Sequence, residues 1–243
     1  MIPSRKWALL VAYGYTEDTQ RRWLWFLQQA GIDPAHALVL DNKAPILPGV
    51  LAGSNRHFEF SGYSELLEHV SDRLAAEDVV YLFNDTLFSH HWTRGWAQLI
   101  QENSRIPSGI YGDPRLEPVN LDGRALRILA SWHFALHGHQ AITILQDALA
   151  NVLSQFDTPI ADPAYKAYQA NYLQPRWWGG YTKVLTSEAY AIKQRCIWAE
   201  HRLSRKLEES TELQAYPNGS YPQVHRMDRL LAAKRRISNL FQA

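Results

Sequence analysis

The chain has 243 residues, of which 46% are hydrophobic and 20% charged, and its formal net charge is +1. This composition predicts a globular protein with one large domain or two small ones, and a charge so near zero gives no strong field to attract nucleic acid. The single cysteine, Cys196, excludes a disulfide framework and a cysteine-based zinc site within one chain. No stretch approaches the roughly 18 consecutive apolar residues of a transmembrane helix. We therefore expect a cytoplasmic protein that does not bind nucleic acid.

The first half of the chain alternates short apolar runs with amphipathic helical patterns. The runs are too short for helices and are typical of buried strands; they occupy residues 7–13, 36–42 and 79–83. The helical patterns occupy residues 19–30, closed by Gly31, and residues 63–74, with a loop rich in proline and glycine at 43–53. The alternation predicts an α/β fold with a mostly parallel sheet flanked by helices.

The second half begins with the same alternation and then becomes helical. We expect a helix at 87–104, a turn-rich segment with a short strand near 109–111, a single strand at 126–137 and a helix at 138–156. From about residue 160 the pattern is helical, with a break at 216–222. We therefore divide the chain into an α/β domain, residues 1–160, and a mostly helical C-terminal extension packed on it, residues 161–243.

Small polar residues follow the strand at 79–83. Asn84, Asp85 and Thr86 come directly after VVYLF. Ligands of open α/β sheets bind outside the carboxyl ends of the strands, so these side chains could hold a metal, a phosphate or a hydroxyl-rich ligand. The alternative is a simple turn in which Asp85 caps the next helix.

Four landmarks in a fixed order resemble the nucleotide-sugar-dependent GT-A glycosyltransferases, in particular the inverting family 2. They are a first strand ending near Tyr13, the LVLDN ending of the second, a Gly-Ser-Asn turn at 53–55 before a helix, and a strand ending in Asn-Asp-Thr. The resemblance covers about the first 140 residues. It implies a GT-A-like, Rossmann-like fold that moves a sugar from a nucleotide-diphosphate donor to a glycan or lipid-linked acceptor in surface polysaccharide synthesis.

The resemblance also implies roles for individual residues. Asp41 would accept a hydrogen bond from the nucleotide base or ribose, while Gly53 and Asn55 would line the donor pocket. Asp85, with Asn84, would stand where the family binds a divalent metal, Mn²⁺ or Mg²⁺, which neutralises the leaving diphosphate. We accordingly expect Asp41→Ala to weaken nucleotide binding and leave the fold intact.

The sequence departs from the family pattern at the metal and base motifs. Asn84 and Asp85 are adjacent, where the family has a residue between its two polar positions, and only one of them is a carboxylate. The family's later Glu-Asp pair is not evident. The second hypothesis is therefore a non-catalytic GT-A-like binding or scaffold protein. A methyltransferase is a third, weakened because Tyr13-Gly14-Tyr15 offers one glycine in place of Gly-x-Gly.

An inverting transferase needs a general base near the acceptor hydroxyl. The catalytic candidates are Asp157, in the loop after the 138–156 helix, and His133, on the predicted 126–137 strand. Ordinary structural roles are open for both, and also for the further candidates, which are Asp147, Asp162 and His137. Three basic residues could contact the diphosphate or simply lie in a helical turn or a loop, namely His90, His91 and Arg115. Arg176, Trp177 and Trp178 could form an acceptor platform or a hydrophobic plug.

The C-terminal helix combines apolar and basic residues. Its apolar residues recur at helical spacing: Met227, Leu230, Leu231, Ile237, Leu240 and Phe241. Its basic residues are Arg226, Arg229, Lys234, Arg235 and Arg236. Such a helix can lie on an anionic membrane, which would place the enzyme at the inner face beside a lipid-linked acceptor. The alternative is that the apolar stripe packs on the sheet domain or on a second subunit.

Overall fold

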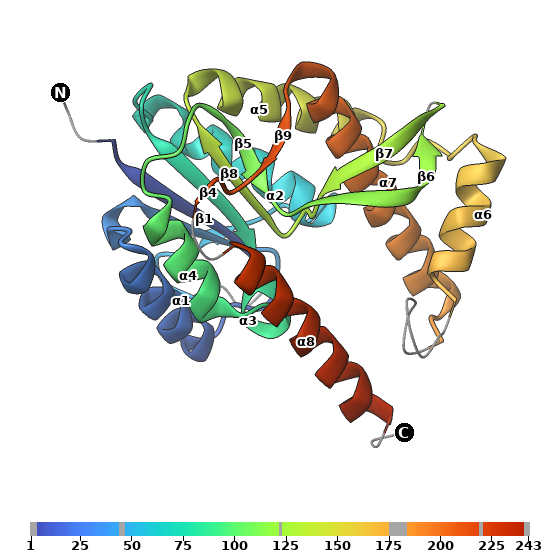
Figure 1. Ribbon diagram of the computed structural model, residues 1–243, viewed down its shortest axis with the longest axis horizontal. Coiled ribbons are helices and arrows are strands. Elements are labelled where there is room, and N and C mark those ends of the chain that lie inside the picture. The colour runs from blue at the N-terminus through green and yellow to red at the C-terminus, as the bar shows by residue number, and fades with distance from the viewer. Residues whose placement is uncertain (1–3, 44–46, 122, 175–183, 219–220, 241–243) are drawn as a thin grey trace.

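The computed structural model describes residues 4–43, 47–121, 123–174, 184–218 and 221–240, and a seven-stranded sheet runs through its centre (Figure 1). The strand order is β3-β2-β1-β4-β8-β5-β9. The strands are β1 (Lys6–Ala12), β2 (Ala37–Asp41), β3 (Leu51–Ala52), β4 (Val79–Asn84), β5 (Gly109–Gly112), β8 (His133–His137) and β9 (Leu213–Ala215). Strands β1 to β4 pair in parallel, β8 lies antiparallel between β4 and β5, and β9 pairs in parallel with β5. The expected α/β fold with a mostly parallel sheet is confirmed.

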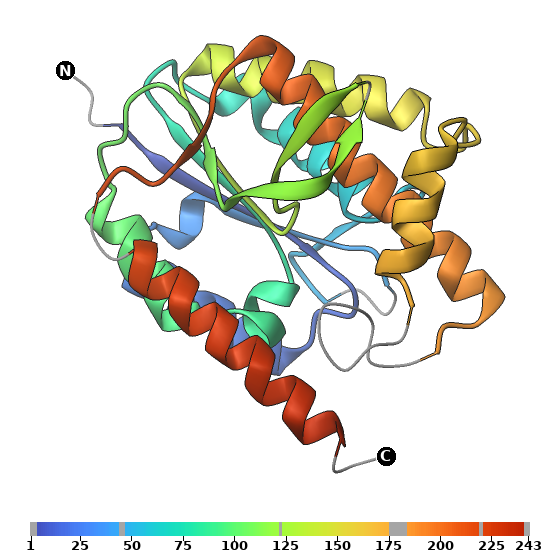
Figure 2. The same cartoon turned by 45° about the vertical axis from the view of Figure 1, so that its right-hand side comes forward.

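Helices cover both faces of the sheet, as Figure 2 shows. One face packs against α2 (Phe58–Val70), α5 (His139–Ser154) and α7 (Ser187–Ser210). The other packs against α1 (Glu17–Ala30), α4 (Thr93–Glu102) and α8 (Tyr221–Leu240). Strands buried on both faces need apolar side chains in both directions, which is why β1 and β4 are continuous apolar runs in the sequence.

Helix α1 shows how local sequence sets the element boundaries. Thr16 caps its start by accepting a hydrogen bond from the Thr19 amide. Gly31 ends it at φ 65°, a left-handed conformation that glycine adopts without a Cβ penalty. Trp23, Phe26 and Leu27 form its buried face, as the sequence predicts.

The predicted single strand at 126–137 is wrong. The chain forms β7 (Arg124–Leu129), turns at residues 130–132, and continues as β8 in the central sheet. β7 instead pairs antiparallel with β6 (Pro114–Leu121), a strand that the turn-rich sequence concealed. The polar–apolar alternation runs through the turn unbroken, so periodicity alone does not reveal it.

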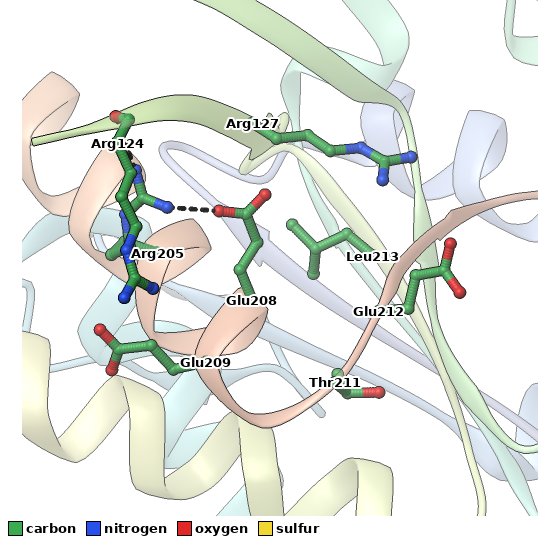
Figure 3. Close-up of a pocket in the computed structure, with 8 residues that line it drawn as sticks. All are labelled: Arg124, Arg127, Arg205, Glu208, Glu209, Thr211, Glu212 and Leu213. Atoms are coloured by element: carbon green, nitrogen blue, oxygen red, sulfur yellow. Dashed lines mark hydrogen bonds and ion pairs between the residues drawn. The ribbon is translucent and has the colours of Figure 1, made fainter. Parts of the chain in front are cut away.

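Arg205 of α7 connects the β6–β7 hairpin to the rest of the protein through hydrogen bonds. Its Nη2 donates to the carbonyls of Leu121, Arg124 and Ala125, at 3.0 to 3.1 Å. Its Nη1 pairs with Glu208 at 2.8 Å, an ion pair visible in the pocket of about 290 Å³ between β7 and the end of α7 (Figure 3). These bonds hold the end of the hairpin at residues 121–125 against α7.

Further differences from the sequence prediction concern helix and strand boundaries. The expected helix at 87–104 is two helices, α3 (Thr86–His90) and α4, because the chain turns at His91 and Trp92. β3 lies within the expected loop 43–53, and β9 interrupts the expected helical extension and joins it to the central sheet. α6 (Pro163–Tyr172) occupies the start of the aromatic segment. Arg176, Trp177 and Trp178 lie outside the described residues.

Candidate functional site

The carboxyl ends of the parallel strands meet at one edge of the sheet, which places three predicted positions together. Tyr13, Asp41 and Asp85 stand at the ends of β1, β2 and β4. The turn at 130–132 joins them because β8 is antiparallel to β4 and so begins where β4 ends. The Asn84 amide donates to the Trp132 carbonyl at 3.0 Å. We call this edge the strand-end site.

The carboxylate of Asp41 is buried and accepts hydrogen bonds from three backbone amides. Its side chain is 1% exposed. Its Oδ1 accepts from the amides of Gly14 at 2.8 Å and Lys43 at 3.0 Å, and its Oδ2 accepts from the amide of Tyr15 at 2.6 Å. This corrects the expectation that Asp41 is free to accept a hydrogen bond from a nucleotide. Its carboxylate holds the loop between β1 and α1 in shape instead.

Three other predicted donor-site residues also shape the backbone at this edge. A Cβ on Gly53 would lie 2.1 Å from Asn42 Oδ1 and 2.3 Å from Leu40 Cδ2, so a larger residue where β3 ends beside β2 would require these side chains to move. Asn55 is exposed and has φ 50°, a turn conformation that asparagine tolerates. Asn84 is buried and accepts hydrogen bonds from the amide and hydroxyl of Thr86, which fixes the start of α3.

Asp85 is the predicted residue best placed for a ligand. It is half-buried, and its Oδ2 accepts from the Tyr13 amide at 3.0 Å. Its carboxylate makes no capping hydrogen bond to α3, which argues against a purely capping role. Burial raises the pKa of Asp85, and the charge of Asp41 adds to this rise, while the Tyr13 amide opposes it.

Asp85 would need other ligands to hold a metal. Among the described residues, no three His, Cys, Asp or Glu side chains come together as a metal-ligand group. Mg²⁺ binds through one or two carboxylates together with substrate phosphates and water. The chemistry of the site therefore fits a cation shared with a bound diphosphate, and not a cation held by protein atoms alone.

Two carboxylates that sequence reasoning missed meet at Ser131. Its amide donates to Glu200 Oε1 at 2.6 Å, and its hydroxyl donates to Glu59 Oε1 at 3.3 Å. The hydroxyl of Tyr63 donates to the Ser131 carbonyl at 2.6 Å. Burial is the main cause that raises the pKa of both Glu59 and Glu200, and the charge of Glu200 further raises the pKa of Glu59. Such carboxylates are poised for proton transfer.

A cavity of about 660 Å³ opens beside the strand-end site. This volume lies within the range of about 300–1,000 Å³ that is usual for ligand pockets. Its walls come from α3, the 130–132 turn, α7 and α8, and include Thr86, His91, Trp132, Glu200 and Asp228. Five further basic residues line it: His90, Arg115, His225, Arg229 and Arg235. Thr86 and Glu200 connect the cavity to the strand-end site.

Some of the basic side chains that line the cavity are already paired with other groups of the protein. Arg115 is held by Asp113, with Nη2 and Oδ2 2.6 Å apart. Arg235 donates to the Ser89 carbonyl at 2.7 Å. Arg229 is exposed, and it has no ion pair with any of the described residues. The lining can therefore offer guanidinium groups to an anionic ligand.

Neither catalytic candidate from the sequence is well placed to act as a base. His133 is 0% exposed and lies in the core, with Nδ1 3.0 Å from the Leu82 carbonyl and Nε2 2.5 Å from the Tyr216 hydroxyl. Burial lowers its pKa to about 3, so it is a neutral core residue, which corrects the expectation. Asp157 is 72% exposed, pairs with Arg195 at 3.1 Å and is not among the residues lining the cavity.

The structure also places the weaker candidates. Asp147 is exposed on α5, and Asp162 caps α6 by accepting from the amides of Ala164 and Tyr165. His137 lies at the far end of β8, since β8 begins at the strand-end site. His90 and His91, by contrast, both line the cavity.

Helix α8 docks on the body mainly through polar contacts. Asp228 and Arg235, two turns apart, bond to the α3–α4 region. Leu230 and Ile237, also two turns apart, are 54% and 50% exposed. These two residues therefore do not pack on the sheet domain, and packing on a second subunit stays open as the alternative. In the parts of the chain that the structure describes, no helix is long and apolar enough to cross a membrane.

Comparisons with known proteins add little to this geometry. No protein-family model matches the chain, and no curated protein matches it. A solved structure titled 4-diphosphocytidyl-2C-methyl-D-erythritol synthase matches 81% of this chain and 100% of its own, with 13% sequence identity and a TM-score of 0.36. A likeness of this degree carries no argument about activity.

Proposed function

We propose that the chain is a nucleotide-sugar-dependent glycosyltransferase, which moves a sugar from a nucleotide-diphosphate donor to a glycan or lipid-linked hydroxyl acceptor. One observation carries the proposal. The half-buried carboxylate of Asp85 stands at the carboxyl ends of the parallel strands, and the next residue, Thr86, lines the cavity of about 660 Å³. This is the position at which open α/β sheets bind their ligands.

In this proposal the donor lies across the strand ends, between the β1–α1 loop and Asp85. Asp41, Gly53 and Asn84 fix the backbone around the donor, and Asn55 lies at its rim. A Mn²⁺ or Mg²⁺ shared by Asp85 and the diphosphate would supply charge neutralisation as the glycosidic bond breaks. The guanidinium groups of the cavity can contribute to the same neutralisation.

Nucleotide binding tests the proposal directly. Calorimetry with UDP and GDP, each with and without Mn²⁺, should show binding that Mn²⁺ strengthens. Asp85→Asn should remove most of the metal-dependent gain, because an amide is a much weaker ligand for a hard cation than a carboxylate. A matched control is Asp147→Asn, since Asp147 is exposed on α5 away from the cavity. Absence of binding to either nucleotide by the wild-type chain would refute the proposed function.

The non-catalytic binding or scaffold protein is the second candidate. It is favoured by Asp41, whose carboxylate is engaged by three backbone amides, and by the lack of a protein-only metal group in the described ranges. The two candidates differ in turnover. A binding protein would hold the nucleotide sugar without releasing its nucleoside diphosphate, whereas a transferase would release it to water or to an added hydroxyl acceptor.

A further inference from the structure

His91 lines the cavity, and one of its ring nitrogens forms a hydrogen bond with a carboxylate. It lies between α3 and α4, and its ring stacks on Trp132 with centroids 3.6 Å apart and planes inclined by 14°. Its Nδ1 is 2.8 Å from Asp228 Oδ2. The side chains of both residues are 12% exposed. The ring is therefore held by a face contact and by a hydrogen bond at the same time.

Asp228 is itself held rigidly by two tryptophans. Its Oδ1 accepts from the Trp92 amide at 2.6 Å, and its Oδ2 accepts from the Trp96 indole nitrogen at 2.9 Å. Both of these groups are donors only, so the carboxylate acts as the acceptor toward His91 as well. That arrangement places the ring proton on Nδ1 of the neutral imidazole and leaves a lone pair on Nε2. Nε2 has no hydrogen bond to any residue that the structure describes.

We propose that His91 is the general base for the acceptor hydroxyl in the transfer reaction, with Asp228 as its positioning residue. The inference rests on the proposed glycosyltransferase function. A base oriented by a buried carboxylate, with its second nitrogen open to a substrate cavity, is the arrangement that general-base catalysis requires. Asp157 and His133 lack such a position. His225 also lines the cavity, with Nδ1 3.3 Å from Asp113 Oδ1, but its side chain is 37% exposed against 12% for His91. Asp113 is moreover already paired with Arg115 and accepts from the Tyr221 hydroxyl, so it holds His225 less closely than Asp228 holds His91.

The proposed step is balanced in protons and electrons. The acceptor hydroxyl gives its proton to His91 Nε2 while its oxygen forms a bond to the anomeric carbon of the donor. The bond from that carbon to the diphosphate oxygen breaks, and its electron pair leaves with the diphosphate. The Asp228 carboxylate stabilises the resulting imidazolium. The proton then passes to solvent through the open cavity.

Glu200 is the main competitor for the same role. It lines the cavity, but its Oε1 accepts from the Ser131 amide. Burial raises the pKa of Glu200, so this carboxyl group could also exchange a proton with a substrate. A comparison of His91 and Glu200 variants therefore separates the two assignments.

The experiment measures release of UDP or GDP from UDP-glucose, UDP-N-acetylglucosamine and GDP-mannose, with n-octyl β-glucoside as acceptor. The variants are His91→Ala, His91→Asn and Glu200→Gln, and the control is His69→Ala, since His69 is exposed on α2. In His91→Asn the amide nitrogen takes the place of Nδ1 and can still donate to Asp228, so α8 stays anchored. Calorimetry with the released nucleotide checks that donor affinity is kept.

We expect both His91 variants to lose about 100-fold to 10,000-fold in kcat, the usual contribution of a general base, with the donor affinity unchanged. Added imidazole should restore part of the turnover in His91→Ala, because the missing ring leaves its place on Trp132 open. A purely structural role would not respond to imidazole. His69→Ala should match the wild type.

Each other outcome is decisive. Turnover in His91→Asn within a few-fold of the wild type, a loss in His91→Ala that imidazole does not restore, or a loss confined to Glu200→Gln would each overturn the inference and leave the proposed function standing. No turnover by the wild-type chain with any of these donors would overturn the glycosyltransferase proposal and this inference together.

Discussion

Replacement of Asp41 by asparagine should destabilise the protein much more than the same change at Asp85. The two carboxylates stand at the ends of β2 and β4, the two strands that flank β1, so they form a matched pair at the same sheet edge. Asp41 is 1% exposed and accepts three backbone amides, whereas Asp85 is half-buried and accepts one. The sequence alone suggested that Asp41→Ala would leave the fold intact.

The magnitude follows from the hydrogen bonds that an amide can keep. In Asp41→Asn the new side chain would have one acceptor oxygen, which could serve Gly14 and Lys43, but its NH₂ group would then face the amide of Tyr15. A hydrogen bond to a charged group contributes about 1.5–3 kcal/mol, and a buried donor left unpaired costs about 1–3 kcal/mol. We therefore expect Asp41→Asn to lower the free energy of unfolding by about 3 kcal/mol. In Asp85→Asn the amide oxygen can still accept from Tyr13, so the loss should be about 1 kcal/mol or less.

Urea unfolding of the wild type and both variants, followed by circular dichroism, measures this difference. An unchanged m value would show that the variants differ in stability and not in the compactness of the unfolded chain. A free energy for Asp41→Asn within about 1 kcal/mol of the wild type would refute the reasoning. The β1–α1 loop would then not depend on the carboxylate that the structure places beneath it.

Three further predictions concern separate parts of the molecule. Asp85→Asn should abolish transfer, with melting within a few degrees of the wild type; full activity in this variant would remove Asp85 from the site. His201 is buried against the Tyr165 hydroxyl, and burial lowers its pKa to about 4, so the unfolded chain takes up a proton below about pH 6.5 that the folded chain does not. Stability should therefore fall by about 3 kcal/mol between pH 6.5 and pH 4 through this residue, and urea titrations should show a shallower fall in His201→Gln. Leu230→Ser with Ile237→Ser should reduce sedimentation with phosphatidylserine vesicles without lowering the melting temperature; unchanged sedimentation would exclude membrane contact through these two residues.

The strands of the central sheet could be predicted because burial on both faces appears in the sequence as continuous apolar runs. β1 and β4 are buried on both faces, and each reads as an uninterrupted apolar run between polar segments. Helix α1 likewise shows its cap residues and its buried stripe. In these elements local propensity, apolar pattern and tertiary environment agree, which is the condition under which sequence reasoning succeeds.

The hairpin and the last strand could not be predicted because tertiary contacts decide them. β6 exposes Leu116 at 74%, so its apolar pattern does not indicate a buried face. β9 has only three residues, and it forms a strand because it pairs in parallel with β5. The turn at 130–132 depends on Asp113 and Glu200, which accept from the amides of Ala130 and Ser131 and come from other parts of the chain.

The sheet edge at which Asp41 and Asp85 stand could be predicted from the sequence, but the contacts of their side chains could not. The order of strands and polar endings located the edge where Asp41 and Asp85 stand. Whether such a carboxylate faces a ligand or a backbone amide depends on a loop path that no local pattern encodes. Ser131, the meeting point of Glu59 and Glu200, belongs to a turn that the sequence does not indicate.

Under the proposed function, helix α8 would link the cavity to a lipid-linked acceptor. The face that carries Asp228 and Arg235 anchors the helix and completes the cavity wall, while the face that carries Leu230 and Ile237 points to solvent. Residues seven apart lie on the same side of a helix, so each pair marks one continuous face. If the outward face rests on a membrane, the inward face holds His91 and the cavity within one helix diameter of the lipid, about 10 Å. A lipid-linked acceptor could then reach the base without leaving the bilayer, which gives the exposed apolar residues of α8 a direct part in the proposed reaction.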